Sequence, residues 1–232
     1  MKRVLVVAAH PDDEVLGCGG TLALLSQNGF EVHVLVLGEG VTSRDPVRNS
    51  ETKAGKIEAL RNAGRRASEL LGISHISFES LPDNRFDTVP LLEIVKQIEE
   101  TITQLSPMII LTHFTGDLNV DHRITAQAVL TAARPLPGSP IQAILGFEIP
   151  SSTEWGFSEF FPTVYVPIFE YLDLKLSALS AYAEELRNFP HPRSPEAILA
   201  LARKRGSEVG VPAAEAFVLY RAIGFFKNFL IR

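Results

Sequence analysis

Four polar residues stand close together near the start of the chain, directly after an aliphatic run. The stretch VLVVAAHPDDE ends in His10, Asp12, Asp13 and Glu14. Three carboxylates and an imidazole within five residues repel one another and hold water strongly, so a fold that needs only a turn would not select them. A bound dication would compensate this crowded negative charge.

A simpler explanation fits part of the same cluster. Asp12 and Asp13 precede an expected helix that begins near Val15, where free N–H groups and the helix dipole favour carboxylates. Capping accounts for one acid and leaves two acids and a histidine unexplained. On spacing alone, a metal site and a capped helix are equally good interpretations.

A second cluster of the same kind favours the metal site. The stretch THFTGDLNVDHR also ends an aliphatic run, MIILTH, and it supplies His113, Asp117, Asn119, Asp121 and His122. Two nitrogen ligands and one carboxylate, from His10, Asp13 and His122, would leave a fourth position for water. That is the pattern of catalytic zinc, whereas structural zinc is closed by four protein ligands.

The remaining acids of the two clusters have expected roles of their own. Asp12, outside the ligand set, is positioned to take a proton from a water activated by the metal, which explains why the first cluster needs two aspartates. Asp121 either orients a neighbouring imidazole or caps the helix that it precedes. Glu14 is expected to hold the loop by accepting backbone N–H bonds.

Strands and helices that alternate along the chain would position these clusters. Strand-like runs cover residues 3–9, 31–38, 75–80, 108–113, 141–149 and 163–168; helical patterns cover about 21–29, 50–71, 91–105, 121–133, 172–186 and 195–206. This alternation predicts an α/β fold, a Rossmann-like and mostly parallel sheet with helices on both faces, in a single domain over residues 1–232. Ligands bind beyond the carboxyl ends of strands in such sheets, where both clusters fall.

Composition excludes several other classes of function. The net charge is −5 and the basic residues are scattered, so no surface for nucleic acid is expected. Cys18 is the single cysteine, which excludes a disulfide framework and favours the cytoplasm. No apolar run is long enough to span a membrane, and acids follow the first apolar run where a signal peptide would need small residues.

The two motifs AHPDDEVLGCGGTLA and GDLNVDHR resemble those of the LmbE-like or PIG-L zinc-dependent N-deacetylases. The resemblance implies that His10, Asp13 and His122 bind Zn²⁺ and that Asp12 is the general base. It implies removal of the acetyl group from a small N-acetylated amino sugar or glycoconjugate, with release of acetate. The alternatives are a metal-dependent amidase on another acylated amine and a non-catalytic metal- or sugar-binding module. A nucleotide-binding site is disfavoured because HPDDEVLGCGG is not G-x-G-x-x-G and its acids would repel a pyrophosphate.

One position departs from the pattern of the resemblance. Many relatives carry a second histidine three residues before the last ligand, where this chain has Asn119. Asparagine can donate a hydrogen bond to an oxyanion but cannot deliver a proton. His113 and His191 are the candidates for the missing acid. His191 is preferred because its proline-rich loop, RNFPHPRSP, could form the rim of the site, in this chain or in a second copy within a homo-oligomer.

Substrate contacts are expected from polar loops that follow strands. Arg48, Asp83 and Arg85 are the candidates there, although a solvated or ion-paired surface residue is the more ordinary interpretation of each. Trp155 could stack on a sugar face, pack in the core or line an interface between subunits. Glu215, in the last segment, is expected to tie the tail to the domain.

Overall fold

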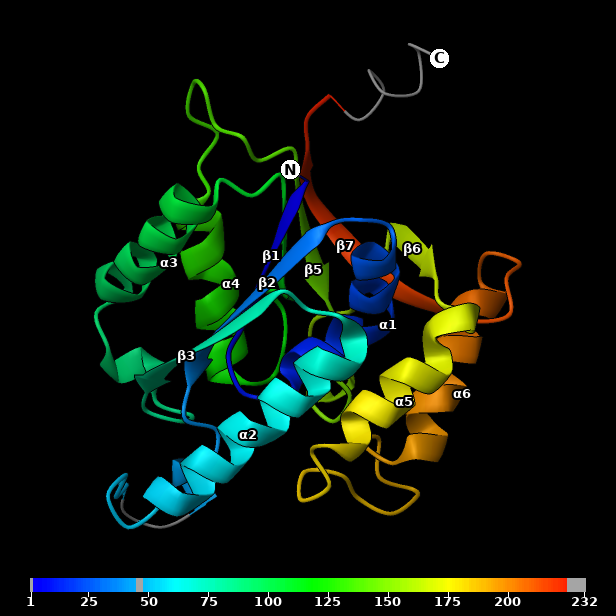
Figure 1. Cartoon of the computed structure of the whole chain (residues 1–232), viewed down its shortest axis with the longest axis horizontal. Helices are drawn as coiled ribbons and strands as arrows, with labels where there is room; N and C mark the ends of the chain where they lie inside the picture. The colour runs from blue at the N-terminus through cyan, green and yellow to red at the C-terminus, as the bar shows by residue number, and fades with distance from the viewer. Residues whose placement is uncertain (1, 45–47, 225–232) are drawn as a thin grey trace.

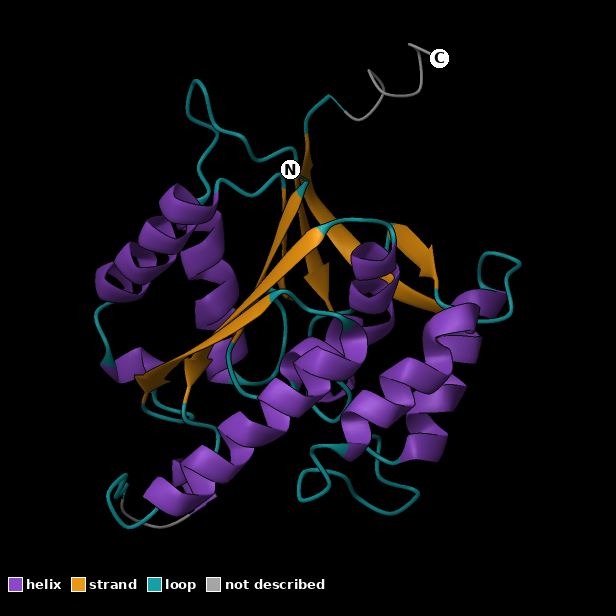
Figure 2. Ribbon diagram, in the orientation of Figure 1, coloured by secondary structure: helices purple, strands orange, loops and turns teal. Residues whose placement is uncertain are grey.

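Seven strands form one sheet in the computed structural model, which describes residues 2–44 and 48–224. Their order is β3-β2-β1-β4-β5-β7-β6, and Figure 2 shows the sheet between its helices. The first five are parallel, and β7 runs antiparallel to both of its neighbours. The bounds are β1 (Arg3–Ala8), β2 (Glu31–Gly38), β3 (His75–Leu81), β4 (Ile109–His113), β5 (Ala143–Phe147), β6 (Val164–Pro167) and β7 (Ala214–Ala222). The predicted mostly parallel α/β sheet is confirmed.

Helices cover both faces of this sheet. In Figure 1, α3 (Leu91–Leu105) and α4 (Val120–Ala132) lie together on one side. The other side carries α1 (Asp13–Gln27), α2 (Ala54–Leu71), α5 (Leu172–Ser180) and α6 (Pro195–Ser207). Within the described residues, no helix is both long and apolar enough to cross a membrane.

The apolar run of β1 serves two cores at once. Val4, Val6 and Ala8 pack in the core under α1, α2 and α5. Leu5, Val7 and Ala9, on the alternate positions, pack in the core under α3 and α4. Because successive side chains of a strand point to opposite faces, a strand covered on both faces must be apolar throughout. This explains why the run shows no alternation of polar residues.

The strand order creates the place where the two polar clusters meet. The chain moves from β1 to β2 and β3 in one direction, and then places β4 and β5 on the opposite side of β1. The loops that follow β1 and β4 therefore lie next to each other at the carboxyl end of the sheet and lead to helices on opposite faces, which is the switch point where α/β proteins bind ligands. The proline-rich loop 134–140, which the sequence allows either as a rim of the site or as a plain turn, precedes β5 and lies at the opposite edge of the sheet, so it is not part of the rim (Figure 1).

The last strand was not predicted. The segment that contains Glu215 was expected only to be tied to the domain, but it forms β7, which inserts between β5 and β6. Glu215 interrupts the apolar pattern of this segment, yet its side chain is only 5% exposed. The carboxylate of Glu215 can be buried because it accepts hydrogen bonds from backbone N–H groups of α1.

Helix α1 is broken in its middle, and Glu215 compensates the break. Cys18 has non-helical dihedral angles (φ −147°, ψ 17°). A second helical segment starts after it, and its first N–H groups have no carbonyl partner within the helix. Gly20 and Thr21 donate these N–H groups to the two oxygens of Glu215, at 2.9 and 2.7 Å. The carboxylate thus acts as a cap supplied by a strand far along the chain.

Lys175 of α5 completes this arrangement from the other side. Its Nζ lies 2.6 Å from Oε1 of Glu215 and donates at 2.9 Å to the carbonyl of Leu16, before the break. Lys175 is 4% exposed. The ion pair therefore satisfies both sides of the broken helix and fixes the segment that begins with Asp13.

We expect Glu215→Gln to lower the free energy of unfolding by about 3 kcal/mol, because it leaves Lys175 buried without an anion. The measurement is urea denaturation at pH 7. The double variant Glu215→Gln/Lys175→Met should recover part of the loss, because it removes the unpaired charge. An unchanged midpoint in the single variant would contradict the role of this pair.

Candidate metal centre and active site

Three side chains from separate elements converge at the carboxyl end of β1. His10 lies in the loop after β1, Asp13 is the first residue of α1, and His122 lies in the first turn of α4. Oδ2 of Asp13 is 3.4 Å from Nε2 of His122 and 3.5 Å from Nδ1 of His10. One ligand atom from each of the three lies within 4.8 Å of the others. The proposed ligands are therefore brought together.

The unsatisfied atoms of this group show that it fits a metal ion. Oδ1 of Asp13 and Nε2 of His122 are buried, and neither has a hydrogen-bond partner among the described residues. Asp13 is fully buried and His122 is 1% exposed. Buried polar atoms are nearly always paired, so two buried ligand atoms without a hydrogen-bond partner in one group fit a cation-binding site.

Carboxylates behind the two histidines fix the orientation of their rings. Nε2 of His10 lies 2.9 Å from Oδ2 of Asp121, and Nδ1 of His122 lies 3.1 Å from Oδ1 of Asp117. With those nitrogens bonded outward, Nδ1 of His10 and Nε2 of His122 remain for a metal. Metal-binding histidines are commonly held by carboxylates in this way.

Asp121 orients an imidazole and does not cap its helix. The cap of α4 is Asn119, whose Oδ1 accepts from the N–H groups of Asp121 (2.8 Å) and His122 (3.4 Å). Asp121 also accepts from the backbone N–H groups of Asn84 and Phe86, at 2.6 and 2.9 Å. Of the two expectations for Asp121, the geometry supports the first.

The loop after β5 holds the carboxylate behind His122. The hydroxyl groups of Ser152 and Thr153 both donate to Asp117. Although burial alone would raise the pKa of Asp117, its hydrogen bonds with His122, Ser152 and Thr153 lower it to about 2. Asp117 is therefore a charged carboxylate, and it accepts a hydrogen bond from the Nδ1–H group of His122.

Asp12 is not one of the three candidate ligands and has a partner of its own. Its Oδ2 lies 2.9 Å from Nη1 of Arg193, and its side chain makes no capping bond to α1. Burial raises the pKa of Asp12 to about 8, even though Arg193 opposes the shift. A carboxylate with a pKa near neutrality can both accept and release a proton. Capping is thus not the role of Asp12.

The backbone of Asp12 is also unusual. Its φ is 107°, in the left-handed region that residues other than glycine rarely adopt. Glu14 supports this conformation, since its Oε2 accepts the N–H of Asp12 at 3.1 Å while its Oε1 accepts the hydroxyl of Tyr182 at 2.6 Å. The expectation that Glu14 accepts a backbone N–H agrees with this geometry. Burial raises the pKa of Glu14 to about 7.

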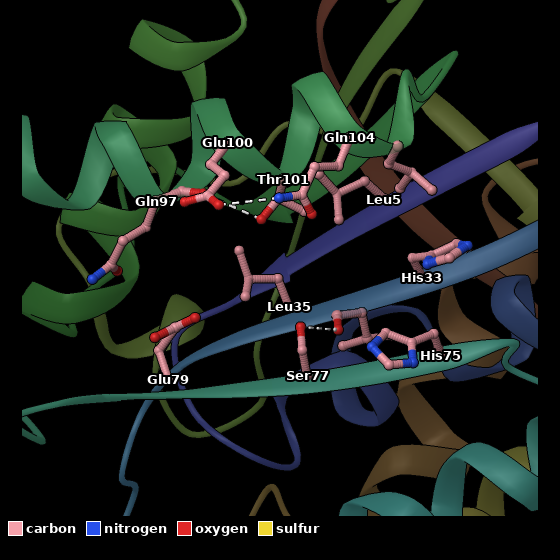
Figure 3. Close-up of a pocket in the computed structure, with 12 residues that line it drawn as sticks. Leu5, His33, Leu35, His75, Ser77, Glu79, Gln97, Glu100, Thr101 and Gln104 are labelled. Atoms are coloured by element: carbon pink, nitrogen blue, oxygen red, sulfur yellow. Dashed lines mark hydrogen bonds between the residues drawn. The ribbon is translucent and has the colours of Figure 1, made fainter.

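A polar pocket of about 140 Å³ opens beside these residues. Its lining includes His10, Asp12, Asp83, Asn84, Asn119 and Arg193. A separate hollow of about 440 Å³ lies between α3 and strands β2 and β3, where His33 and His75 face it (Figure 3). That hollow contains neither polar cluster, so the smaller pocket is the candidate active site.

Of the three expected substrate contacts, only Asp83 lines this pocket. Its Oδ1 lies 3.3 Å from Nε2 of His10, and its Oδ2 accepts from the hydroxyl and N–H of Ser43. Arg48 instead forms a two-bond ion pair with buried Glu39, with a shortest distance of 2.6 Å. Arg85 is exposed and outside the lining.

The two candidate acids lie in different surroundings. His113 is fully buried and stacks on His122, and its Nε2 accepts the N–H of Ala9 at 2.8 Å. Burial, reinforced by His122, lowers the pKa of His113 to about 3, so it is neutral. A neutral and fully buried imidazole is poorly suited to supply a proton, which agrees with the preference for His191.

His191 lies in the loop between α5 and α6. Its Nδ1 accepts the N–H of Arg193 at 3.1 Å, and its ring lies edge-on to Trp155 with the centroids 5.9 Å apart. A neutral histidine that accepts at Nδ1 carries its proton at Nε2. His191 is not among the residues that line the pocket, although its neighbour Arg193 is.

Sequence reasoning missed Arg193 and the loop that contains Ser152 and Thr153. The sequence does indicate that both segments could lie near the site, because SSTEW follows a parallel strand and PHPRS belongs to the proline-rich loop expected at the rim. Neither segment carries a motif that identifies which of its residues turns inward. Their contacts join parts of the chain that are far apart in sequence.

Comparisons with known proteins agree with the geometry. The family model PIG-L: GlcNAc-PI de-N-acetylase matches residues 5–133. The chain is 29% identical over 187 residues to the uncharacterized deacetylase YaiS of Escherichia coli K12, covering 78% of this chain and 90% of the relative. It is 28% identical over 186 residues to the probable N-acetyl-alpha-D-glucosaminyl L-malate deacetylase 2 of Bacillus cereus, covering 79% and 84%.

Among solved structures, the fold is similar to that of GalB, the 4-carboxy-2-hydroxymuconate hydratase of Pseudomonas putida KT2440. The TM-score is 0.78, the identity is 24%, and the match covers 96% of this chain and 98% of that chain. At this identity the similarity concerns the fold alone. The family model, however, spans both motifs that carry the proposed ligands and more than half of the chain. The chain therefore belongs to the PIG-L (GlcNAc-PI de-N-acetylase) family.

Proposed function

We propose that the protein is a metal-dependent N-deacetylase that removes the acetyl group from a small N-acetylated amino sugar or glycoconjugate and releases acetate. One observation carries the proposal: three candidate ligand side chains lie beside a carboxylate, Asp12, that is not one of them and that lines the polar pocket together with His10. The relatives named deacetylases favour this activity over a different amidase or a non-catalytic module.

In this proposal His10, Asp13 and His122 hold Zn²⁺. Two imidazoles and one carboxylate suit zinc and leave a position open for catalysis. A zinc ion bound there would polarise the amide carbonyl and lower the pKa of water. The support is the pair of unsatisfied buried atoms, Oδ1 of Asp13 and Nε2 of His122.

The chain's own residues divide the remaining work. Asp12 takes a proton from the attacking water, and Asn119 donates from Nδ2 to the carbonyl oxygen as it gains negative charge. His191, in its protonated form, gives a proton to the nitrogen of the leaving amine and is left as the neutral imidazole. Asp83, which lines the pocket, accepts a hydrogen bond from a sugar hydroxyl.

A cytoplasmic location and assembly into a homo-oligomer remain predictions. The first rests on Cys18 as the single cysteine. The second follows from the histidine that is missing at the position of Asn119, since a neighbouring copy could supply His191 to complete the site. Size-exclusion chromatography with light scattering measures the second directly.

The first experiment measures acetate release from a panel of N-acetylated sugars, from monosaccharides to conjugates, by protein reloaded with zinc. We expect release that stops after chelation and returns when zinc is restored. Turnover of 4-carboxy-2-hydroxymuconate without acetate release from any member of the panel would contradict the proposal and favour a hydratase.

Asp12 and His122 should respond differently to substitution. Asp12→Asn should lower kcat about 10³-fold while metal stays bound, because it removes a proton acceptor and no ligand. His122→Ala should lose metal as well as activity. Metal content by mass spectrometry, beside kcat, separates the two variants.

The exposed residue Asp173 supplies the control, since Asp173→Asn should leave both kcat and metal content unchanged. Equal metal loss in the Asp12 and His122 variants would remove the assigned division between base and ligand.

His191→Ala should lower kcat on the order of 10²-fold if His191 protonates the leaving amine. His191→Asn is the sharper variant, because its Oδ1 can still accept the N–H of Arg193 while its amide cannot release a proton. His75→Ala, on the far hollow, is the control. Full activity of His191→Asn would mean that His191 only holds its loop.

A further inference from the structure

We propose that Arg193 is the positioning residue for Asp12, so that it acts on the reaction through the general base. This inference rests on the proposed deacetylase function. Nη1 of Arg193 lies 2.9 Å from Oδ2 of Asp12, and the two side chains are 22% and 5% exposed. The contact joins the loop before α6 to the loop after β1, about 180 residues earlier.

A second hydrogen bond fixes the plane of the guanidinium group. Nε of Arg193 donates to Oγ of Ser151 at 2.9 Å. Because a guanidinium group is planar and rigid, two bonds from different nitrogens define its orientation, and thereby that of the carboxylate it contacts. A lysine at this position would keep the positive charge, but it would not fix the orientation of the Asp12 carboxylate.

Arg193 and its partner Ser151 both lie in loops that are fixed by further hydrogen bonds. Arg193 directly precedes Ser194, which caps α6 by accepting the N–H of Ala197 at 3.1 Å. Ser151 has a left-handed backbone (φ 68°), and its N–H donates to Oε1 of Glu154 at 2.7 Å. The guanidinium group is therefore placed by two structured loops and not by a mobile side chain alone.

The contact with Arg193 leaves one carboxylate oxygen of Asp12 free to accept a proton. Arg193 occupies Oδ2, whereas no hydrogen bond within the described residues uses Oδ1 of Asp12, and Asp12 lines the pocket. A carboxylate held by one oxygen presents the other in a defined direction. That arrangement is what a base needs in order to meet a water at a fixed position.

The other arginine of the pocket is not available for this role. Nη2 of Arg44 lies 2.6 Å from both carboxylate oxygens of Glu185. Arg193 is thus the cation paired with Asp12 in the part of the chain that the structure describes.

The kinetic test separates positioning from binding. Arg193→Ala should lower kcat on the order of 10²-fold with KM nearly unchanged and metal retained, because a misplaced base weakens the transition state and not substrate binding. Guanidinium ion should restore part of the lost kcat in this variant, and Arg193→Lys should keep more activity than Arg193→Ala. Ser151→Ala should lower kcat less, and adding it to Arg193→Ala should cause no further loss.

Arg187→Ala is the matched control, because Arg187 lies in the same loop and bonds only to nearby carbonyl groups among the described residues. Its kcat should equal that of the wild type. Full kcat in Arg193→Ala would overturn the proposal. So would a loss of kcat that neither guanidinium ion nor lysine restores, or a loss accompanied by release of metal.

A double-mutant cycle measured by Tm tests the coupling between Arg193 and Asp12 without any substrate. Arg193→Ala should lower Tm by leaving the carboxylate of Asp12 buried and unpaired, and Arg193→Ala/Asp12→Asn should regain part of that loss. Additive Tm shifts would overturn the link. If the wild type releases no acetate from any sugar, the proposed function fails, while this cycle still decides whether Arg193 and Asp12 are coupled.

Discussion

Every buried carboxylate near the pocket needs a specific partner, and the rest of the structure depends on this constraint. Asp12 is paired with Arg193, Glu14 accepts the hydroxyl of Tyr182, and Asp121 holds His10. Asp13 keeps a fully buried oxygen without a hydrogen-bond partner among the described residues, and it is the carboxylate among the candidate ligands. A site with this much buried charge is stable only if distant elements bring their compensating groups to it. The fold around the sheet supplies those groups.

The strand order explains how two short motifs become one site. The loops after β1 and β4 meet because the chain reverses its direction of growth across the sheet between these strands. Helices α1 and α4 then start at that edge and present Asp13 and His122 in their first turns. The outer carboxylates Asp117 and Asp121 come from the same segment as His122, so that one loop both supplies a ligand and orients two rings.

Local patterns in the sequence were sufficient for the sheet, the helices on both faces and the convergence of His10, Asp13 and His122. These features follow from apolar periodicity and from the rule that parallel strands place their carboxyl ends together. β7 could not be predicted in the same way, because Glu215 interrupts its apolar pattern and is satisfied only by N–H groups of α1. Arg193 was missed for a similar reason. Its role depends on a contact with Asp12 that no spacing in the sequence encodes.

The broken helix α1 has a consequence for the order in which the protein can be completed during synthesis. The segment that begins with Asp13 is held by Lys175 and Glu215, which leave the ribosome long after it. The nascent chain can therefore form β1 to β4, with all three candidate ligands already made, before the groups that fix α1 exist. A chain at that stage has its metal-binding side chains without the frame that holds them. Because Glu215 lies in β7, the contacts that fix the two halves of α1 can form only after that strand has left the ribosome.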